Sequence, residues 1–141
     1  MRGITFNGKH SYWDWGLMLT KPPKISSPEP KTHYVDIPGA HGAMDLTEAL
    51  TGKVQFHNRK IELEFIDAMA DREDWSAIYS DILSWLHGQV AEISLDDDPQ
   101  HYYKGRVTVG DPERINGKAV TLKMTAEVEP FKRTYEGTGV L

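Results

Sequence analysis

Residues 22–52 most constrain the fold of this chain, because they combine apolar side chains with more prolines and glycines than a packed core element tolerates. Connections longer than about 12–15 residues are uncommon in compact domains unless they bind something or are disordered. Disorder is typical of segments with few apolar residues. This segment instead carries several, and we therefore expect an arm, over about residues 22–53, whose apolar groups are covered by another molecule. These groups include Val35, Ile37, Met44, Leu46 and Leu50.

The expected arm has the pattern of a β-hairpin that contacts a second copy of the chain. Residues 34–37 alternate between polar and apolar side chains, and the glycines that follow let the tip of the hairpin turn. One head-to-tail contact, repeated from copy to copy, closes a ring if its rotation closes. If the arm pairs with the edge of a sheet, backbone hydrogen bonds set the register. We expect the oligomer interface to comprise Val35, Ile37, Gly39, Gly42, Met44, Leu46 and Leu50.

The length of 141 residues fits a single domain over residues 1–141, and the end of the chain, residues 134–141, has the composition of a flexible tail. The chain has no Cys, which excludes disulfides and thiolate metal sites. Its N-terminus lacks the apolar core of a signal peptide, and no run approaches the ~20 apolar residues of a membrane helix. We expect no export by that route and no contact with a membrane.

Most of the chain alternates apolar and polar residues with the period of a β-strand. The clearest strands are residues 60–66 and residues 119–128. The dipeptides Asn7-Gly8 and Asn116-Gly117 are typical of hairpin turns because both residues tolerate positive φ. Shorter strands are expected at residues 4–6, 16–19, 32–37, 54–57, 90–95 and 102–109.

One segment, residues 73–87, has the three- and four-residue spacing of a helix that buries one face. Asp71 is expected to cap its N-terminus and Gly88 its C-terminus. One helix among antiparallel strands favours a mainly β fold, a β-sandwich with one α-helix and a protruding β-hairpin arm, which is α+β by count. The expected core residues of the helix are Trp75, Ile78, Tyr79, Ile82, Trp85 and Leu86.

No motif indicates catalysis, and we expect no catalytic residues, no metal site and no cofactor. Calcium loops need oxygens at alternate positions around a glycine, whereas Asp96-Asp97-Asp98 are consecutive and precede Pro99, a pattern typical of a solvated turn. The six histidines lack the spacing of zinc ligands. The sequence contains no nucleophile elbow and no glycine-rich nucleotide loop. A hydrolase remains an alternative only if two acids face each other across a cleft.

The aromatic residues Trp13 and Trp15 leave a second class of function open. Beside Tyr12, they are candidates for an exposed platform that binds sugar or a partner, as in a carbohydrate-binding module. Aromatic residues near the start of a strand belong more often to the core. Net charge argues against a nucleic-acid-binding protein, since 16 Lys and Arg against 21 Asp and Glu give −5.

Several blocks of the sequence, in their order along the chain, resemble the distal tail proteins of siphoviruses and related prophages. They include the opening residues 3–17, the block from Pro38 to Gly52, the helix that begins near Trp75, residues 95–107 and the closing residues 129–132. The resemblance runs through nearly the whole chain. It implies an N-terminal β-sandwich with a helix and a hairpin arm, and many family members carry a further C-terminal domain.

The resemblance also implies a function as a structural adaptor of the virion tail. Family members form hexameric rings, a baseplate hub that joins the tail tube protein to the tail tip or tail-associated protein. The expected partners are therefore other copies of this chain, the tube protein and the tip protein. DNA would pass through the lumen without specific binding. The expected location is the distal end of the virion tail, after synthesis in the bacterial host cytoplasm.

Overall fold

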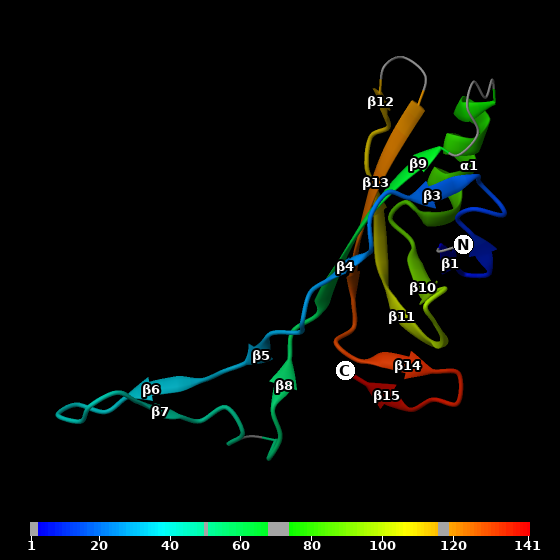
Figure 1. The fold of residues 1–141 in the computed structure, drawn as a ribbon. Helices are drawn as coiled ribbons and strands as arrows, with labels where there is room; N and C mark the ends of the chain where they lie inside the picture. The colour runs from blue at the N-terminus through cyan, green and yellow to red at the C-terminus, as the bar shows by residue number, and fades with distance from the viewer. Residues whose placement is uncertain (1–2, 50, 68–73, 116–118) are drawn as a thin grey trace.

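The computed structural model describes residues 3–49, 51–67, 74–115 and 119–141. They form a body, built from a curled β-sheet and one helix, and an arm that leaves the body (Figure 1). The helix α1 is Trp75–Leu86. The strands of the body are β1 Ile4–Phe6, β2 Lys9–His10, β3 Leu17–Leu19, β9 Arg59–Asp67, β10 Val90–Leu95, β11 Asp98–Val109, β12 Glu113–Ile115, β13 Ala119–Val128, β14 Lys132–Thr134 and β15 Gly139–Val140.

The main sheet has the order β2-β1-β10-β11-β13-β9-β3, and its neighbouring strands are antiparallel. It curls so far that the two ends of this order approach each other, since Ile4 of β1 and Leu19 of β3 line one small pocket of about 190 Å³. The mainly β class with one helix is thus confirmed. The strands belong to one hydrogen-bonded sheet instead of the two sheets of the expected sandwich, because the long strand β11 pairs with β10 on one side and with β13 on the other.

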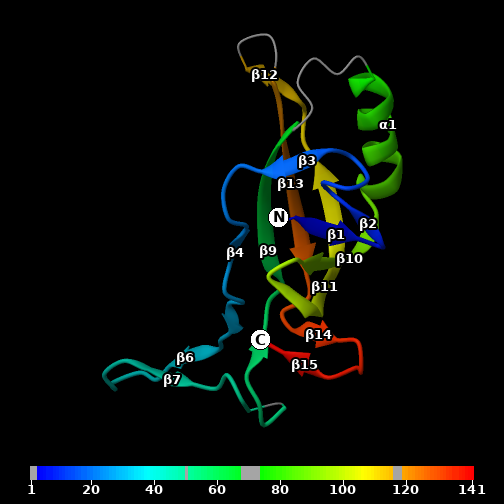
Figure 2. The same ribbon diagram turned by 45° about the vertical axis from the view of Figure 1, so that its right-hand side comes forward.

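Alternation along the two central strands builds the core, as the sequence predicted. Ile61, Leu63 and Phe65 of β9 lie opposite Ala126, Met124 and Leu122 of β13, and all six side chains are buried. In Figure 2 the helix α1 lies against the sheet on the side of β10. Of the helix residues predicted for the core, Trp75, Ile82 and Leu86 are buried, whereas Ile78, Tyr79 and Trp85 pack on the core while partly buried.

Turns and caps explain where several elements begin and end. Asn7 and Gly8 take φ of 48° and 91° and join β1 to β2, which confirms the predicted hairpin. Gly88 follows the helix with φ 73°, as expected of a C-terminal cap. The N-cap is Asp74. The predicted cap Asp71 and the predicted turn Asn116-Gly117 lie outside the described residues.

The C-terminal residues, which include the tail expected over residues 134–141, form a short hairpin. Strand β14 pairs with both β11 and β15. Gly137, at φ 98°, lies in the turn between β14 and β15. The Tyr135 ring lies 5.1 Å from that of Tyr102, and Lys132 donates to Asp98 at 2.8 Å. Glycines that suggested flexibility in the sequence instead allow this tight turn.

Candidate assembly interface

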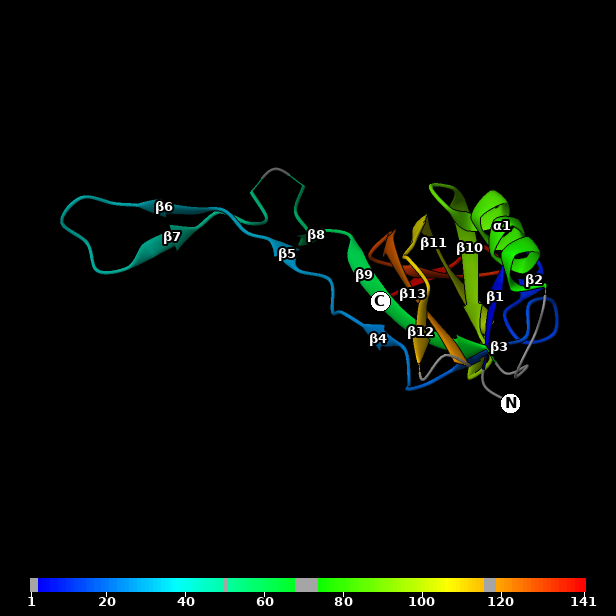
Figure 3. The ribbon, with the colours of Figure 1, turned by 90° about the horizontal axis from the view of Figure 1, so that it is seen from above.

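Five short strands, in three antiparallel pairings, carry the arm away from the body (Figures 1 and 3). The first, β4 Lys24–Ile25, pairs with β9 and is still part of the main sheet. Further out, β5 Pro30–Lys31 pairs with β8 Gln55–Phe56. At the far end β6 Tyr34–Asp36 pairs with β7 Ala43–Asp45 to make a two-stranded ribbon. The predicted hairpin arm is therefore present and does not fold back onto its own body.

Hydrogen bonds at the foot of the arm tie it to the strand β9. Ser26 exchanges two hydrogen bonds with the backbone of Lys60: Ser26 N donates to Lys60 O at 3.0 Å, and Lys60 N donates to Ser26 Oγ at 2.9 Å. The Ser26 carbonyl also accepts a bond from Arg59 Nε at 3.1 Å. The Phe56 ring meets the Phe131 ring edge-on at 6.0 Å. These contacts fix the direction in which the arm leaves the sheet.

The ribbon has two chemically different faces, because side chains alternate along each strand. Val35 lies opposite Met44, and Tyr34 lies opposite Asp45. The pairing continues past the strands, since Leu46 N donates to the His33 carbonyl at 2.7 Å. We call one side the apolar face, which comprises Val35, Ile37, Met44 and Leu46, with His33 at its base. We call the other side the acidic face, which comprises Tyr34, Asp36, Ala43 and Asp45.

The apolar face is uncovered in the single chain. Val35 is 38% exposed, Ile37 42% and Met44 49%. Leu46 is partly buried and lines a hollow of about 370 Å³ with Ala49 and other residues of the arm. Scattered exposed apolar residues are ordinary, but a contiguous apolar face marks a surface that another molecule covers. Four residues predicted for the interface thus share one side of the ribbon.

The two predicted glycines shape the tip of the ribbon. Gly39 and Gly42 have φ of 81° and 71°, a region that residues with a Cβ rarely adopt, and both lie on the turn between β6 and β7. At the base of β7 the Asp45 carboxylate accepts hydrogen bonds from the backbone and hydroxyl of Thr47, which lower the pKa of Asp45. Leu50, also predicted for the interface, lies outside the described residues.

The acidic run does not converge on a ligand. Asp96-Asp97 forms the tight turn predicted between β10 and β11, but β11 begins at Asp98 and so earlier than expected. Asp96 accepts from Gly3 N at 2.9 Å and faces His10 Nε2 at 2.9 Å. Asp98 pairs with Lys132, and this hydrogen bond, with one from His101, lowers the pKa of Asp98. Among the residues described, no group of three or more acids and histidines is placed to hold a metal.

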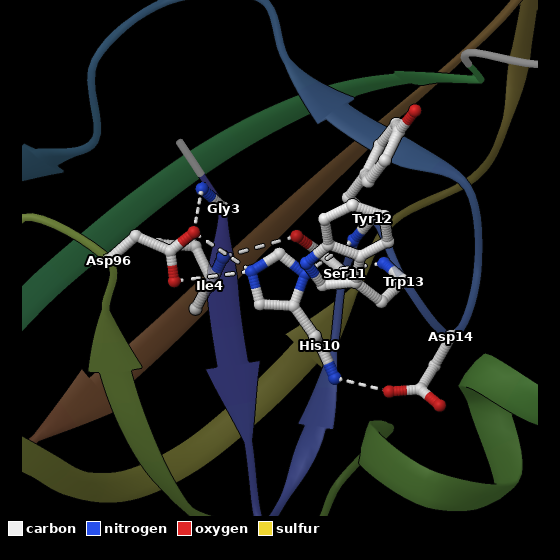
Figure 4. A network of polar contacts seen from close by, with 8 residues as sticks. All are labelled: Gly3, Ile4, His10, Ser11, Tyr12, Trp13, Asp14 and Asp96. Carbon is white, nitrogen blue, oxygen red and sulfur yellow. Dashed lines mark hydrogen bonds and ion pairs between the residues drawn. The ribbon is translucent and has the colours of Figure 1, made fainter. Parts of the chain in front are cut away.

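His10, Ser11 and Asp96 lie together, which invites comparison with a hydrolase triad (Figure 4). The His10 Nδ1 accepts from the backbone N–H of Tyr12 at 3.1 Å and of Trp13 at 3.3 Å, so the proton lies on Nε2, which faces Asp96. The buried Ser11 Oγ accepts from Ile4 N at 3.1 Å. A triad requires the serine to donate to the histidine. Here both His10 nitrogens are already engaged, Nδ1 by the backbone of the turn and Nε2 by Asp96, so neither accepts a bond from Ser11, whose hydroxyl holds the backbone of β1.

The two tryptophans predicted as a ligand platform have different surroundings. Trp15 is 1% exposed and donates to Asp81 at 2.9 Å, a bond that is the main reason for the lowered pKa of Asp81. Of the two alternatives for Trp15, the structure therefore shows the core position and not the exposed platform. Trp13 is 74% exposed, and its ring meets that of Tyr12 edge-on at 4.8 Å.

Sequence reasoning missed two parts of the arm. It found the alternation of residues 34–37 but not the partner strand β7, so the acidic face was not recognised. The signal in the sequence was a second short stretch, residues 44–46, in which apolar and polar side chains alternate. Gly39 and Gly42 separate it from residues 34–37. It also missed the contact between Phe56 and Phe131, which are distant in sequence and carry no local motif.

The described residues combine a curled antiparallel sheet, one helix and a projecting two-stranded ribbon. Among solved structures, the chain is similar to the crystal structure of the SPP1 Dit protein (gp 19.1), described as a paradigm of the hub adsorption apparatus in phages that infect Gram-positive bacteria. The TM-score is 0.65 and the sequence identity 20%, over 95% of this chain and 52% of that chain. The chain thus spans about half the length of that protein. The resemblance to distal tail proteins is confirmed at the level of the fold.

A more distant likeness is to a protein in the tail of an empty GTA particle, with a TM-score of 0.38 and 14% identity over 79% of this chain and 77% of that chain. No family model matches the sequence. No curated protein matches it either. Within the described residues no helix is long and apolar enough to cross a membrane.

Proposed function

We propose that this protein is a non-enzymatic structural component of a phage tail, a ring-forming adaptor that joins the tail tube to the tail tip or baseplate. The fold shared with the SPP1 Dit protein supports a place in the tail. Its partners are other copies of the chain, the tube protein and a tip or tail-associated protein. The ring is a hexamer at the distal end of a siphovirus or prophage tail, with DNA passing through its lumen, and the chain is made in the host cytoplasm. The net charge of −5 suits a lumen that does not retain phosphates.

The observation that carries this proposal is the uncovered apolar face of the arm. Val35, Ile37 and Met44 lie on one side of a ribbon that its own body does not touch, so a second molecule must cover them if they are to leave water. Burial of apolar area contributes about 25 cal/mol per Å², and a standard interface buries about 1,600 Å² in total. Because one arm contacts a different surface on the next copy, the contact is head-to-tail, which generates rings.

The test is the mass of the assembled protein. Light scattering of the purified protein is expected to give the mass of about six copies, and electron micrographs are expected to show annuli. Replacement of both Val35 and Ile37 by Asp places charges in the interface, so we expect monomers with an unchanged far-UV circular dichroism spectrum. The matched control replaces two exposed residues of the helix, Ser76 and Ser84, by Asp and leaves the mass unchanged. An unchanged mass for the arm variant would remove the apolar face from the interface.

A carbohydrate-binding module is the second candidate, and the exposed ring of Trp13 is the observation that favours it. Sugar stacked on Trp13 would change the tryptophan fluorescence when host-wall sugars are added. The fluorescence change would be absent from Trp13→Ala. It would be present in V35D/I37D, the variant that we expect to be monomeric. A flat fluorescence titration of the wild type would reject this candidate and leave the adaptor unaffected.

A further inference from the structure

We propose that the acidic face of the arm docks in a cationic groove on the body of a second copy. This inference rests on the proposed self-assembly and names the surface that receives the arm. The groove has a volume of about 450 Å³ and lies where the arm joins β9, on the sheet formed by β9, β13 and β11. It is lined by Asn58, Arg59, Lys60, Arg106, Thr108, Thr125, Ala126 and Glu127.

The charges of the groove are not balanced within the chain. Two cations, Lys60 and Arg106, and one carboxylate, Glu127, project from the face of the sheet that the groove occupies. Arg106 donates to the Gly88 carbonyl at 2.7 Å, and among the described residues no carboxylate pairs with it. Lys60 has only a long contact of 3.6 Å with its own strand neighbour Glu62.

Arg59 lies on the other face of β9 from Lys60. Side chains alternate along the strand, so Arg59 shares the core face with Ile61, and its guanidinium lies 5.7 Å from the ring centroid of the buried Tyr103 while its Nε donates to the Ser26 carbonyl. The cations that face the groove are therefore Lys60 and Arg106, which lie on either side of Glu127 in the neighbouring strands.

The far end of the arm has the complementary charge. Residues 32–51 contain three carboxylates, Asp36, Asp45 and Glu48, and neither Lys nor Arg. Asp36 and Asp45 lie on the acidic face beside the exposed ring of Tyr34. Tyrosine and arginine are enriched in protein interfaces, and a tyrosine ring also attracts a cation. Opposite charges across an interface steer association and fix its register.

Geometry excludes the chain's own arm as the occupant. The groove lies at the foot of the arm, and the ribbon extends away from that foot (Figure 3). A second copy of the chain is therefore the occupant, with the acidic face of its ribbon in the groove. The apolar face is then turned away from the groove and is left for a further neighbouring copy in the ring. Nucleic acid fits less well, because the groove contains a carboxylate and the chain as a whole is anionic.

Cross-linking between two differently tagged proteins tests this contact directly, because the native chain has no Cys. One protein carries Tyr34→Cys on the acidic face, and the other carries Thr108→Cys at the exposed rim of the groove. Both substitutions leave the charges in place. We expect mixed disulfides in at least about tenfold excess over the control pair of Tyr34→Cys with Ser84→Cys on the helix. Equal yields from the two pairs would overturn the proposal.

Charge reversal gives the second readout. In the Cys-bearing proteins, the groove variant K60E/R106E is expected to lower the yield of mixed disulfide about tenfold, and the arm variant D36K/E48K is expected to do the same. Combining the reversed groove with the reversed arm should restore the yield. The control K104E/K123E has the same change of charge on exposed residues outside the groove and should leave the yield unchanged. A combined variant that stays as weak as the single ones would contradict the pairing.

The outcomes separate this inference from the proposed function. If V35D/I37D turns rings into monomers but the Cys pair at Tyr34 and Thr108 links no better than its control, the ring remains and the groove proposal fails. If the wild type shows neither self-association nor cross-linking at any concentration, both proposals fail. If duplex DNA binds the wild type but not K60E/R106E, and the arm does not cross-link, the groove serves nucleic acid and the proposal is overturned.

Discussion

Val35 lies directly opposite Met44 in the ribbon, and both side chains belong to its apolar face. Residues that face each other across two antiparallel strands interact by about 0.2–1 kcal/mol. We expect Val35→Ala and Met44→Ala each to weaken self-association, and the double variant to lose less than the sum of the two. Sedimentation of the wild type and three variants gives this coupling free energy. Strict additivity would show that the two side chains contact different surfaces in the assembly.

Trp15 and Trp13 are expected to differ sharply in their effect on folding. Trp15→Ala removes a buried ring and its hydrogen bond to Asp81, so the free energy of unfolding should fall by about 3–5 kcal/mol. Trp13→Ala removes an exposed ring and should change it by less than about 0.5 kcal/mol. Urea denaturation followed by circular dichroism measures both. Similar losses for the two variants would contradict the burial of Trp15.

Asp98 should make folding stability depend on pH in the acid range. Its hydrogen bonds from Lys132 and His101 lower its pKa in the folded protein below the usual value of 3.8. The unfolded chain therefore takes up the proton first, and the contribution of Asp98 to stability is present above pH 3.8 and lost as the pH falls through the lowered pKa.

The variant Asp98→Asn lacks this contribution at neutral pH. We expect it to be less stable than the wild type at pH 7, and the difference to shrink as the pH falls below 3.8. Urea denaturation at a series of pH values checks this expectation. Glu136→Gln, an exposed carboxylate in the same C-terminal hairpin, is the control and should show a constant difference. A pH-independent effect of Asp98→Asn would contradict the ion pair.

The contact between Phe56 and Phe131 should set the direction of the arm. With spin labels on Ala40→Cys at the tip and Ser84→Cys on the helix, the wild type should give one narrow distance distribution. Phe131→Ala removes the ring that meets Phe56 and should broaden that distribution. Tyr135→Ala, which removes a neighbouring exposed ring that does not touch the arm, should leave it narrow.

The parts of the fold that depend on local pattern were predictable from the sequence. Strands β9 and β13 follow from strict alternation, and α1 follows from its three- and four-residue spacing. The curl of the sheet was not predictable, because it depends on β11 pairing with strands on both of its sides. Periodicity along one segment carries no information about which strands become neighbours.

The sequence placed the apolar residues of the arm on one side, and their part in an interface stays a prediction, whereas it left open which tryptophan is exposed. Alternation alone identified Val35 and Ile37. Trp13 and Trp15 are two positions apart and would share a face in a strand. They lie instead in a turn that ends at Gly16, with φ 72°, so one ring enters the core and the other stays in water. In such a turn, side chains two positions apart no longer point to the same side, so alternation does not predict which of them is buried.

The arm is rooted in a central strand, since β8 passes into β9 after only two residues. A force on an arm that another molecule holds is therefore transmitted along the axis of β9, which pairs with β13 from Arg59 to Ile66. Loaded in this direction, the hydrogen bonds between the two strands are sheared together and not unzipped one after another. If another molecule holds the arm, the contact that holds it would then break before the body unfolds.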